Sequence, residues 1–389
     1  MKKQLKVLLM ASTLAAGILS GCGAGGSNKS SEDEIKIGVN LELSGAVASY
    51  GQSLEDGIDL AIDEINADGG IDGKKIKPIK VDNKSDLTEA TNGALKLITQ
   101  DKVSAIIGAA TSGDTVAQAQ IASDNKTVLL APAATAPNVT VNNGKVNDYV
   151  FRTCFIDPFQ GIVASNFATK ELNIKNAAIF ADSSSDYAKG LAASFKETFT
   201  ANGGKIVSEE AYVAKDTDFT STLTRIKGKK PDFIFIPGYY EEVGLIVKQA
   251  RDLGITAPLM GGDGWASPKL VELAGKDALN NTFIINHYST VDPDPKIQKF
   301  ISSFKEKNKD KEPDAFNALG YDSVYLLKDA IQRAGSTDSV KIQKALAETK
   351  DLSLITGTIS IDKDHNPVKS ATILEYKDGN QSFKTKVNP

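Results

Sequence analysis

The sequence predicts an α/β protein with two Rossmann-like lobes, each built around a sheet of mostly parallel strands. The chain has 389 residues, which is more than most single hydrophobic cores contain. Short apolar runs alternate with helical patterns in two successive series, the second beginning near residue 157. Many of these runs end in loops rich in small or hydroxyl-bearing residues, and ligands of parallel sheets bind at such strand ends.

The first series of strands and helices begins with the alternating run IKIGVNL. In the helix that follows, Ile58, Ile62 and Ile65 keep one apolar face, and a Gly-Gly pair ends it. The expected strands are 35–41, 76–81, 103–107 and 127–131, and the expected helices are 54–67, 90–100 and 115–123.

The second series repeats this alternation and then gives way to longer helices. Its expected helices are 160–171, 188–202, 220–227 and 241–253, and its expected strands are 177–180, 206–212, 233–236 and 258–260. The end of the chain is expected to hold strands 283–286, 357–361 and 372–376 and helices 295–307, 315–334 and 339–347, with a hairpin turn at Asp378-Gly379.

The start of the chain has the features of a secretory signal. Three lysines precede the apolar residues 7–19, which are fewer than the roughly 20 that a membrane-spanning helix needs. The sequence Leu19-Ser20-Gly21-Cys22 then resembles the bacterial lipobox. This resemblance implies that residues 1–21 are a removed signal peptide and that Cys22 carries a lipid, which would anchor the protein to the extracytoplasmic face of the cell membrane. An ordinary secreted protein with an incidental cysteine is the alternative.

The residues after the lipobox predict a soluble, acidic body on a flexible tether. Residues 22–34 form this tether, and after Cys22 they are mostly Gly, Ser and charged residues with no apolar residue larger than alanine. Loss of residues 1–21, which hold three lysines and no acid, changes the net charge from −4 to −7. Nucleic acid is therefore an unexpected partner, and we expect a monomer. Cys154 is the one cysteine besides the expected anchor Cys22, so it is expected to be a buried thiol rather than part of a disulfide.

Residues 103–140 predict the core of a binding site. Ser112 and Thr135 follow two neighbouring expected strands, in loops without bulky side chains. Hydroxyls and backbone N–H groups in such a place suit a small anionic group such as a carboxylate. The alternative is that Ser112 only caps the next helix.

The sequence predicts no catalytic, metal-binding or cofactor-binding activity. It lacks a Gly-x-Gly-x-x-Gly, a P-loop and a Gly-x-Ser-x-Gly elbow, and its acids show no metal-ligand spacing. A hydrolase built on Ser112 would have to recruit His287, because His365 lies in a polar turn that we expect to be solvated. We therefore expect a binding protein without cofactor or metal, not an enzyme.

The strand-end loops share a second theme, which is hydroxyls, aromatic rings and one carboxylate. Such a set suits a small zwitterion with an apolar tail. Its members are Tyr50, Ser112, Thr135, Tyr187, Tyr239 and Asp263.

Seven motifs, in order, resemble the branched-chain amino acid (Leu/Ile/Val) binding proteins of ABC importers. They are Ser44-Gly45 with Tyr50-Gly51, Asp63-Glu64-Ile65-Asn66 with Gly69-Gly70-Ile71, Gly108 with Thr111-Ser112, Pro132-Ala133-Ala134-Thr135, Asp186-Tyr187-Ala188-Lys189-Gly190, Pro237-Gly238-Tyr239-Tyr240 and Gly261-Gly262-Asp263-Gly264. The resemblance implies capture of Leu, Ile or Val between two closing lobes and delivery to an ABC permease with its ATPase.

The same resemblance implies the type I periplasmic-binding-protein fold, in which three hinge crossings join the lobes. It places residues 35–156 and 286–357 in lobe 1 and residues 157–285 and 358–389 in lobe 2. The change of pattern after Asn286 and the returning C-terminal strands agree with this division.

The family's site maps onto residues of both lobes. By resemblance, Ser112 and Thr135 hold the ligand carboxylate, the Ala133 carbonyl and Thr135 hydroxyl accept from its ammonium, and Asp263 pairs with that ammonium. The wall around the side chain is then formed by Tyr50, Ala110, Tyr187 and one of Tyr239 and Tyr240. Ala134, in the same turn as Ala133 and Thr135, is a further expected ligand-binding residue.

One position departs from the family's pattern and leaves open how the ligand's ammonium is contacted. Well-known Leu/Ile/Val receptors carry Glu where this chain has Asp263, so the ammonium is contacted directly or through water. The same fold binding another small solute, such as another amino acid, an amide, urea or an aromatic acid, is the alternative function.

Overall fold

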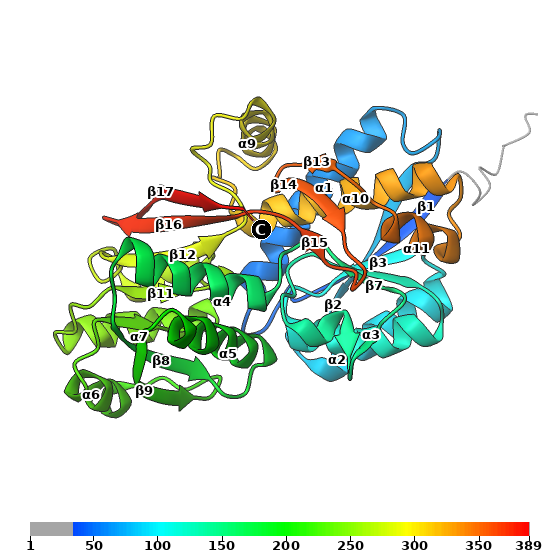
Figure 1. The fold of residues 1–389 in the computed structure, drawn as a ribbon. Helices are drawn as coiled ribbons and strands as arrows, with labels where there is room; N and C mark the ends of the chain where they lie inside the picture. The colour runs from blue at the N-terminus through cyan, green and yellow to red at the C-terminus, as the bar shows by residue number, and fades with distance from the viewer. Residues whose placement is uncertain (1–33, 389) are drawn as a thin grey trace, which may run out of the picture. The chain divides into compact units, whose positions relative to one another are not determined.

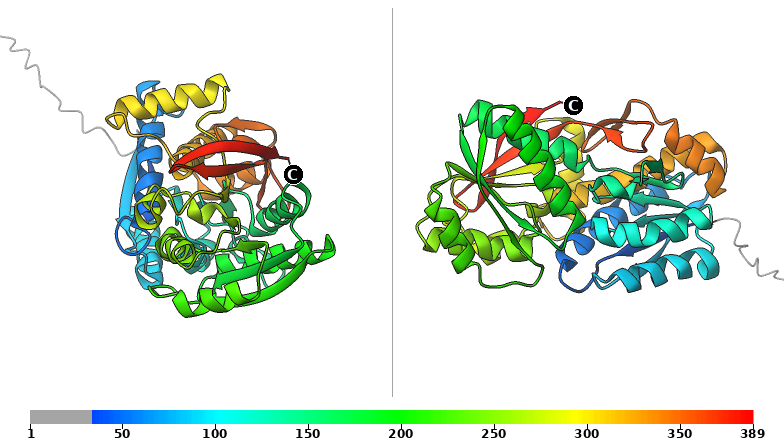
Figure 2. Two further views of the ribbon diagram at one scale, coloured as in Figure 1. Left: turned by 90° about the vertical axis from the view of Figure 1, so that its left-hand side faces the viewer. Right: turned by 60° about the horizontal axis from the view of Figure 1, so that its bottom comes forward.

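The computed structural model describes residues 34–388 (Figure 1). The expected signal peptide, the lipidated Cys22 and the tether, except for its last residue Glu34, lie outside the described residues. Within residues 34–388, none of the helices is both long and apolar enough to cross a membrane. The described chain forms two lobes, each with its own sheet (Figures 1 and 2).

Lobe 1 contains a parallel five-stranded sheet in the order β2-β1-β3-β4-β7. Its strands are β1 (Glu34–Leu41), β2 (Lys75–Asp82), β3 (Ala105–Gly108), β4 (Val128–Ala131) and β7 (Val150–Arg152). Its helices are α1 (Ala48–Ala67), α2 (Leu87–Lys96), η2 (Leu97–Asp101), α3 (Ser112–Asp124), η3 (Pro137–Val139), α9 (Pro295–Lys307), α10 (Ala315–Ala334) and α11 (Ser339–Ala347), and a small hairpin is formed by β5 (Val141–Asn142) and β6 (Lys145–Val146).

Both faces of the lobe 1 sheet are buried, because successive side chains of its strands pack against helices on opposite sides. Ile106 and Leu129 pack in one cluster with residues of α2 and α3. Ile107 and Leu130 point the other way, into a cluster with residues of α1 and α10. Apolar runs without a polar face, as in AIIG and VLLA, are therefore explained by helices on both sides.

Lobe 2 contains a seven-stranded sheet in the order β17-β16-β12-β11-β10-β8-β9. Its strands are β8 (Asn176–Asp182), β9 (Lys205–Tyr212), β10 (Phe233–Phe235), β11 (Leu259–Gly261), β12 (Thr282–Asn286), β16 (Ala371–Lys377) and β17 (Asn380–Val387). Its helices are α4 (Asp157–Asn166), η4 (Phe167–Glu171), α5 (Asp186–Ala201), α6 (Thr220–Gly228), α7 (Tyr240–Asp252), η5 (Asp263–Trp265) and α8 (Lys269–Ala274). The strands from β8 to β12 are parallel, whereas β16 and β17 add two antiparallel strands.

Helices again cover both faces of the lobe 2 sheet. Phe233 and Phe235 pack with residues of α4 and α5, and Ile234 packs with residues of α6, α7 and α8. The green helices α4 and α5 lie together in Figure 1, on the face of the sheet that faces the viewer. Both lobes are thus three-layered, as the sequence predicts.

The chain passes between the lobes three times, after β7, after β12 and before β16. A small antiparallel sheet precedes the last crossing and consists of β13 (Leu352–Leu354), β14 (Gly357–Ile361) and β15 (Pro367–Val368). Its contacts are with lobe 1, because Asp322 of α10 accepts the N–H groups of Ile355 and Thr356 at 2.8 Å each. We therefore propose that the last lobe boundary falls near residue 369, later than the 357/358 boundary expected from the sequence.

The three crossings pack against one another. The rings of Phe155 and His287, from the first and second crossings, stack with centroids 3.8 Å apart. Lys369, on the third crossing, is buried and donates to the carbonyl of Thr153 on the first at 3.4 Å. Its burial lowers the pKa of Lys369 to about 8. The hinge is therefore a packed structure with ionisable groups inside it.

The expectation that His365 is solvated is wrong. Its ring stacks on Phe151 with centroids 4.0 Å apart, and its Nδ1 lies 3.0 Å from the carbonyl oxygen of Val150. The polar turn of β14 and β15 lies against lobe 1, which buries the ring. The expectation that Cys154 is a buried thiol is confirmed, and burial raises the pKa of this thiol to about 12.

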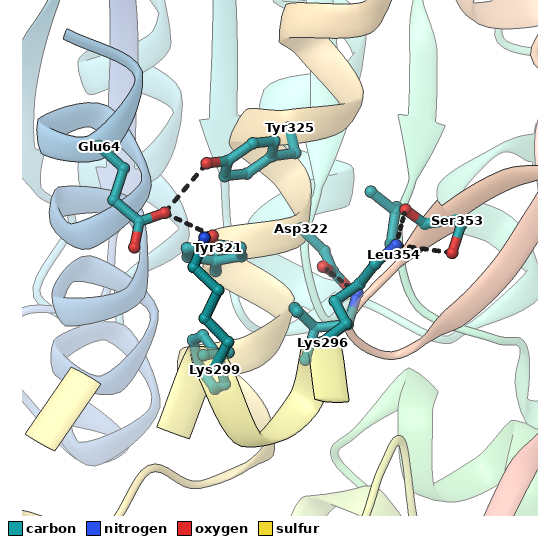
Figure 3. A pocket seen from close by; sticks show the side chains of 10 residues that line it. Glu64, Lys296, Lys299, Tyr321, Asp322, Tyr325, Ser353 and Leu354 are labelled. Atoms are coloured by element: carbon teal, nitrogen blue, oxygen red, sulfur yellow. Dashed lines mark hydrogen bonds between the residues drawn. The ribbon is translucent and has the colours of Figure 1, made fainter. Parts of the chain in front are cut away.

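A cavity of about 590 Å³ lies within lobe 1, lined by α1, α9, α10 and β13 (Figure 3). Glu64 of α1 accepts hydrogen bonds from the hydroxyls of Tyr321 and Tyr325 at 2.5 and 3.0 Å. Lys296 of α9 reaches across to Ser353 of β13. These bonds tie the two long helices α1 and α10 together and hold the strand that leads to the last crossing.

Most elements match the sequence prediction, and the differences are local. Helix α1 starts at Ala48, six residues before the expected start. The expected helices 90–100 and 160–171 each end in a wider turn, η2 and η4. The short elements η5, α8, β13 and β15 and the last strand β17 were not predicted.

Candidate ligand-binding site

A cavity of about 240 Å³ lies between the lobes, where the carboxyl ends of the strands of both sheets meet. Eight of the nine binding residues predicted from the sequence line it, and they come from both lobes. The full lining is Tyr50, Ala110, Ser112, Ala133, Thr135, Tyr187, Tyr239, Asp263, Gly264 and Phe316. The ninth predicted residue, Ala134, is buried behind this lining, where its carbonyl accepts from Arg152 at 2.7 Å.

The lobe 1 wall includes the loop after β3, and Glu42 supports this loop from behind. Its two carboxyl oxygens accept the N–H groups of Ala110 and Thr111 at 2.9 Å each. Burial and the charge of the neighbouring Asp114 raise the pKa of Glu42 to about 8, and burial also raises the pKa of Asp114. Glu42 therefore keeps its proton at neutral pH, and the pair holds the loop without carrying two charges.

Ser112 is the first residue of α3, and the alternative that it caps this helix is wrong. The cap is Thr111, whose hydroxyl accepts the N–H of Asp114 at 3.3 Å. Ser112 Oγ instead accepts the N–H of Ala136 at 3.1 Å. Because that bond uses a lone pair, the hydroxyl can still donate its hydrogen toward the cavity. The N-terminus of α3 thus presents a hydroxyl and its positive dipole end to the site.

Thr135 follows β4 and lies across from Ser112. Its carbonyl accepts the N–H of Asp157 at 3.0 Å, which joins lobe 1 to the start of α4. Its hydroxyl is buried and makes no hydrogen bond within residues 34–388. A buried hydroxyl without a partner is costly, so this group is suited to a polar atom of a ligand.

Asp263 supplies the one carboxylate that lines the cavity. Its Oδ1 accepts from Gln160 Nε2 at 3.0 Å, and its Oδ2 lies 3.1 Å from His287 Nε2. Burial lowers the pKa of His287 to about 4, so the ring is neutral and donates through Nε2. His287 therefore serves Asp263, and a nucleophile–base pair of Ser112 with this histidine has no hydrogen bond to support it in the described residues.

Four aromatic rings enclose the rest of the cavity. Tyr187 and Tyr239 stack with centroids 5.2 Å apart, and Tyr50 stacks on Phe316 at 4.4 Å. Tyr239, not Tyr240, lines the cavity. Burial raises the pKa of Tyr50 and of Tyr187 well above the usual value, so both phenols are neutral donors or acceptors.

Direct hydrogen bonds between the lobes close the rim of the cavity. The Tyr50 hydroxyl donates to the carbonyl of Gly264 and accepts the N–H of Tyr240 at 3.2 Å. The Tyr240 hydroxyl in turn donates to the carbonyl of Ala46 at 3.1 Å. The two lobes are thus in contact at this rim, and ligand access requires these bonds to open.

Four residues of the site were not predicted from the sequence. Gly264 and Phe316 line the cavity, while Glu42 and Gln160 support it from behind. Gly264 adjoins the predicted Asp263, and Glu42 begins the predicted loop of Ser44 and Tyr50, so proximity in sequence could have indicated both. Phe316 and Gln160 lie in helices without a distinguishing pattern.

The side chains that line the cavity can bind a ligand through one carboxylate, several hydroxyls and aromatic rings. Within residues 34–388, no group of three or more His, Cys, Asp or Glu side chains is arranged to hold a metal ion. The cavity's ten lining residues surround it from both lobes, which suits it to a small solute.

Comparison with known proteins identifies the family. Residues 34–381 match the family model described as periplasmic binding protein. A Leu/Ile/Val-binding protein of Rhizobium johnstonii is 34% identical over 329 residues, which cover 84% of this chain and 87% of that protein. The chain therefore belongs to the periplasmic binding protein family, whose members bind solutes outside the cytoplasm.

Solved structures show the same fold. The branched-chain amino acid transporter substrate-binding protein LivJ of Streptococcus pneumoniae, in complex with isoleucine, is 43% identical with a TM-score of 0.86, covering 92% of this chain and all of that one. An ABC transporter solute-binding protein of R. palustris, in complex with benzoate, is 26% identical with a TM-score of 0.81, covering 92% and 97%.

Proposed function

We propose that the protein is an extracytoplasmic solute-binding lipoprotein of an ABC importer that captures branched-chain amino acids and delivers them to a permease. The observation that carries the ligand class is the pairing of Asp263 on lobe 2 with the hydroxyls of Ser112 and Thr135 on lobe 1 around one small cavity. A carboxylate facing hydroxyl donors matches the ammonium and carboxylate ends of an α-amino acid.

The apolar part of the cavity supports a hydrocarbon side chain. Ala110, Ala133 and Phe316 offer methyl groups and a ring, and the tyrosine rings complete the enclosure. The Leu/Ile/Val names of the relatives agree with this composition. Leu, Ile and Val are therefore the proposed ligands.

The proposed mechanism is capture by closure. In an open state, Ser112 and Thr135 would receive the carboxylate at the N-terminus of α3. Rotation about the three crossings would then bring Asp263 and the tyrosines over the ligand and form the bonds between Tyr50, Tyr240 and Gly264. Because the ligand contacts both lobes, it stabilises the closed state over the open one.

An aromatic acid or another small solute is the second candidate, favoured by the benzoate complex of the R. palustris relative. Such a ligand brings no cation to Asp263, so a buried carboxylate would remain unpaired beside it. The proposed site therefore disfavours a ligand that carries only an acid group.

Titration calorimetry of the unlipidated protein, residues 23–389, tests the proposal. The protein is first unfolded and refolded to remove any bound solute, and is then titrated with the common amino acids, benzoate, urea and simple amides. We expect tight binding of Leu, Ile and Val alone. Binding of benzoate or an amide, with no heat of binding for any amino acid, would instead support the second candidate function.

A further inference from the structure

Gln160, in the first turns of α4, lies behind the cavity wall and contacts two acids at once. Its Nε2 donates to Asp263 Oδ1 at 3.0 Å and, more weakly, to Asp157 Oδ1 at 3.4 Å. Its Oε1 accepts the backbone N–H of Asp263 at 3.0 Å. The Gln160 side chain is fully buried and does not line the cavity itself.

The bonding pattern allows only one orientation of this amide. A backbone N–H can only donate, so the group that faces the N–H of Asp263 must be Oε1. Nε2 then necessarily faces the carboxyl groups of Asp157 and Asp263. Gln160 therefore binds Asp263 at two points, through its backbone and through its side chain.

The second oxygen of Asp263 is held from the hinge. His287 Nε2 lies 3.1 Å from Asp263 Oδ2, and the imidazole is fixed by its stack on Phe155. With one donor on each oxygen, the plane of the carboxylate has a single orientation. Each oxygen keeps lone pairs that can accept from a further donor in the cavity.

The backbone beside Asp263 is shaped for this contact. A Cβ placed on Gly262 would lie 2.7 Å from Gln160 Oε1 and 2.6 Å from the Tyr187 hydroxyl oxygen. Only glycine lets the helix α4 and the ring of Tyr187 approach the strand end this closely. The sequence Gly-Gly-Asp-Gly is thereby explained by the close approach of Gln160 as well as by the turn.

We propose that Gln160 is a positioning residue for recognition of the ligand's ammonium group. It fixes the carboxylate of Asp263 in the direction in which it meets the ammonium, and it does so without touching the ligand. The inference rests on the proposed function, because it names how the same site selects an amino acid over its deaminated analogue.

The test compares leucine with 4-methylpentanoate, which has the same hydrocarbon chain and carboxylate but lacks the ammonium. Affinities of both are measured by calorimetry, with displacement for the weaker one, on refolded wild-type protein and on Gln160→Leu. A hydrogen bond to a charged group contributes enough that its loss is expected to weaken leucine binding roughly 10- to 100-fold. The affinity for 4-methylpentanoate is expected to stay the same or rise, because a released Asp263 can turn away from it.

Two outcomes would overturn the positioning role. One is leucine affinity within twofold of the wild type, and the other is an equal loss for leucine and 4-methylpentanoate, which a merely structural residue would cause. A wild-type protein that binds no amino acid would instead overturn the proposed function, and the positioning role with it. The two failures are therefore distinguishable in one series of titrations.

Matched variants separate a specific effect from damage to the fold. Gln249→Leu removes another amide of lobe 2 that bonds backbone at both ends, to the N–H of Phe219 and the carbonyl of Thr217, away from the cavity. It is expected to leave both affinities unchanged. If Gln160→Leu does not fold, Gln160→Met keeps an unbranched side chain of similar length, removes the donor to the Asp263 carboxylate, and is expected to shift the affinity ratio in the same direction.

Discussion

The two walls of the cavity between the lobes are built in different ways. The lobe 1 wall consists of small residues and hydroxyls on the loops after β3 and β4, together with the rings of Tyr50 from α1 and Phe316 from α10. The lobe 2 wall consists of tyrosine rings and a carboxylate from loops after β8, β10 and β11, supported by residues of the hinge. The lobe 1 wall therefore has no charged side chain in its lining, whereas the lobe 2 wall carries the carboxylate of Asp263.

In the proposed closure, this difference divides ligand recognition between the two lobes. The lobe 1 wall is held by Glu42 and Thr111 within its own lobe, so it is expected to exist whether the lobes are open or closed. Asp263 is held by Gln160 in lobe 2 and by His287 at the second crossing. Its contact with a ligand held on lobe 1 requires closure. Lobe 1 would therefore receive the ligand, and lobe 2 would test it for an ammonium.

Removing the charge of the lobe 2 wall is expected to have the largest effect. Asp263→Ala would leave a buried ammonium unpaired, which costs roughly 3–5 kcal/mol and weakens leucine binding by hundreds- to thousands-fold. Calorimetry measures this loss. The exposed carboxylate Asp218 of the same lobe provides a control, and Asp218→Ala should bind as the wild type does. An Asp263→Ala protein that binds leucine within threefold of the wild type would end the assignment of charge recognition to lobe 2.

Removing a bond between the two walls is expected to have an intermediate effect. Tyr50→Phe deletes the hydroxyl that joins lobe 1 to Gly264 and to the N–H of Tyr240. Because two buried backbone groups lose their partner only in the closed state, leucine affinity should fall by about 5- to 150-fold, mostly through faster release. Stopped-flow measurement of release checks this.

Tyr321→Phe is the matched control for that variant. It removes a hydroxyl that bonds Glu64 entirely within lobe 1. It should lower the stability of the fold and leave the rate of ligand release unchanged. Equal release rates for Tyr50→Phe and the wild type would show that the rim bonds do not hold the closed state.

The smallest effect on ligand affinity is expected from the support of the lobe 1 wall, because Glu42 does not line the cavity and acts on the stability of the fold. The folded-state pKa of Glu42, about 8, is above its ordinary 4.5, so the folded protein keeps a proton that the unfolded chain releases. This contribution to stability is therefore complete below pH 4.5 and is lost as pH rises toward 8. It lowers the free energy of unfolding by no more than about 1.4 kcal/mol for each pH unit.

Denaturant unfolding of the wild type and Glu42→Gln between pH 5 and 8 measures this contribution. Gln does not titrate, so the variant should lose stability less steeply with rising pH. Parallel curves for the two proteins would show that Glu42 does not hold a proton in the folded state.

The fold could be predicted from the sequence because its strands are short apolar runs separated by helices with one apolar face. The AIIG and VLLA strands are buried on both faces, so their wholly apolar composition indicates central strands of a parallel sheet. The early start of α1 was missed because residues 48–53 are mostly small or polar, and contacts with lobe 2 and α10 bury Tyr50 and Ser53 there. The burial of His365 was missed for the same reason, since its partner Phe151 is more than 200 residues away.

The candidate site also contains residues that the sequence could place and residues that it could not. Ser112 and Thr135 could be placed because strand ends of a parallel sheet converge. The sequence could not separate Tyr239 from Tyr240, because neighbouring residues at a helix start point in different directions. Tyr239 is the extended residue before α7 and faces the cavity, whereas Tyr240 is the first helical residue. Gln160 and Phe316 could not be found at all, because their role depends on how helices dock.

The burial of Cys154 allows the protein to be labelled at a single introduced cysteine. This thiol is fully buried with a pKa of about 12, so maleimide dyes are not expected to react with it in the native state. A single cysteine introduced at Leu87, which is 56% exposed and lines a groove shared with Ser184 and Asp186 of lobe 2, would then be the only reactive handle in residues 34–388. A fluorophore attached there would lie in a groove lined by both lobes, so its emission is expected to change if the lobes move relative to each other.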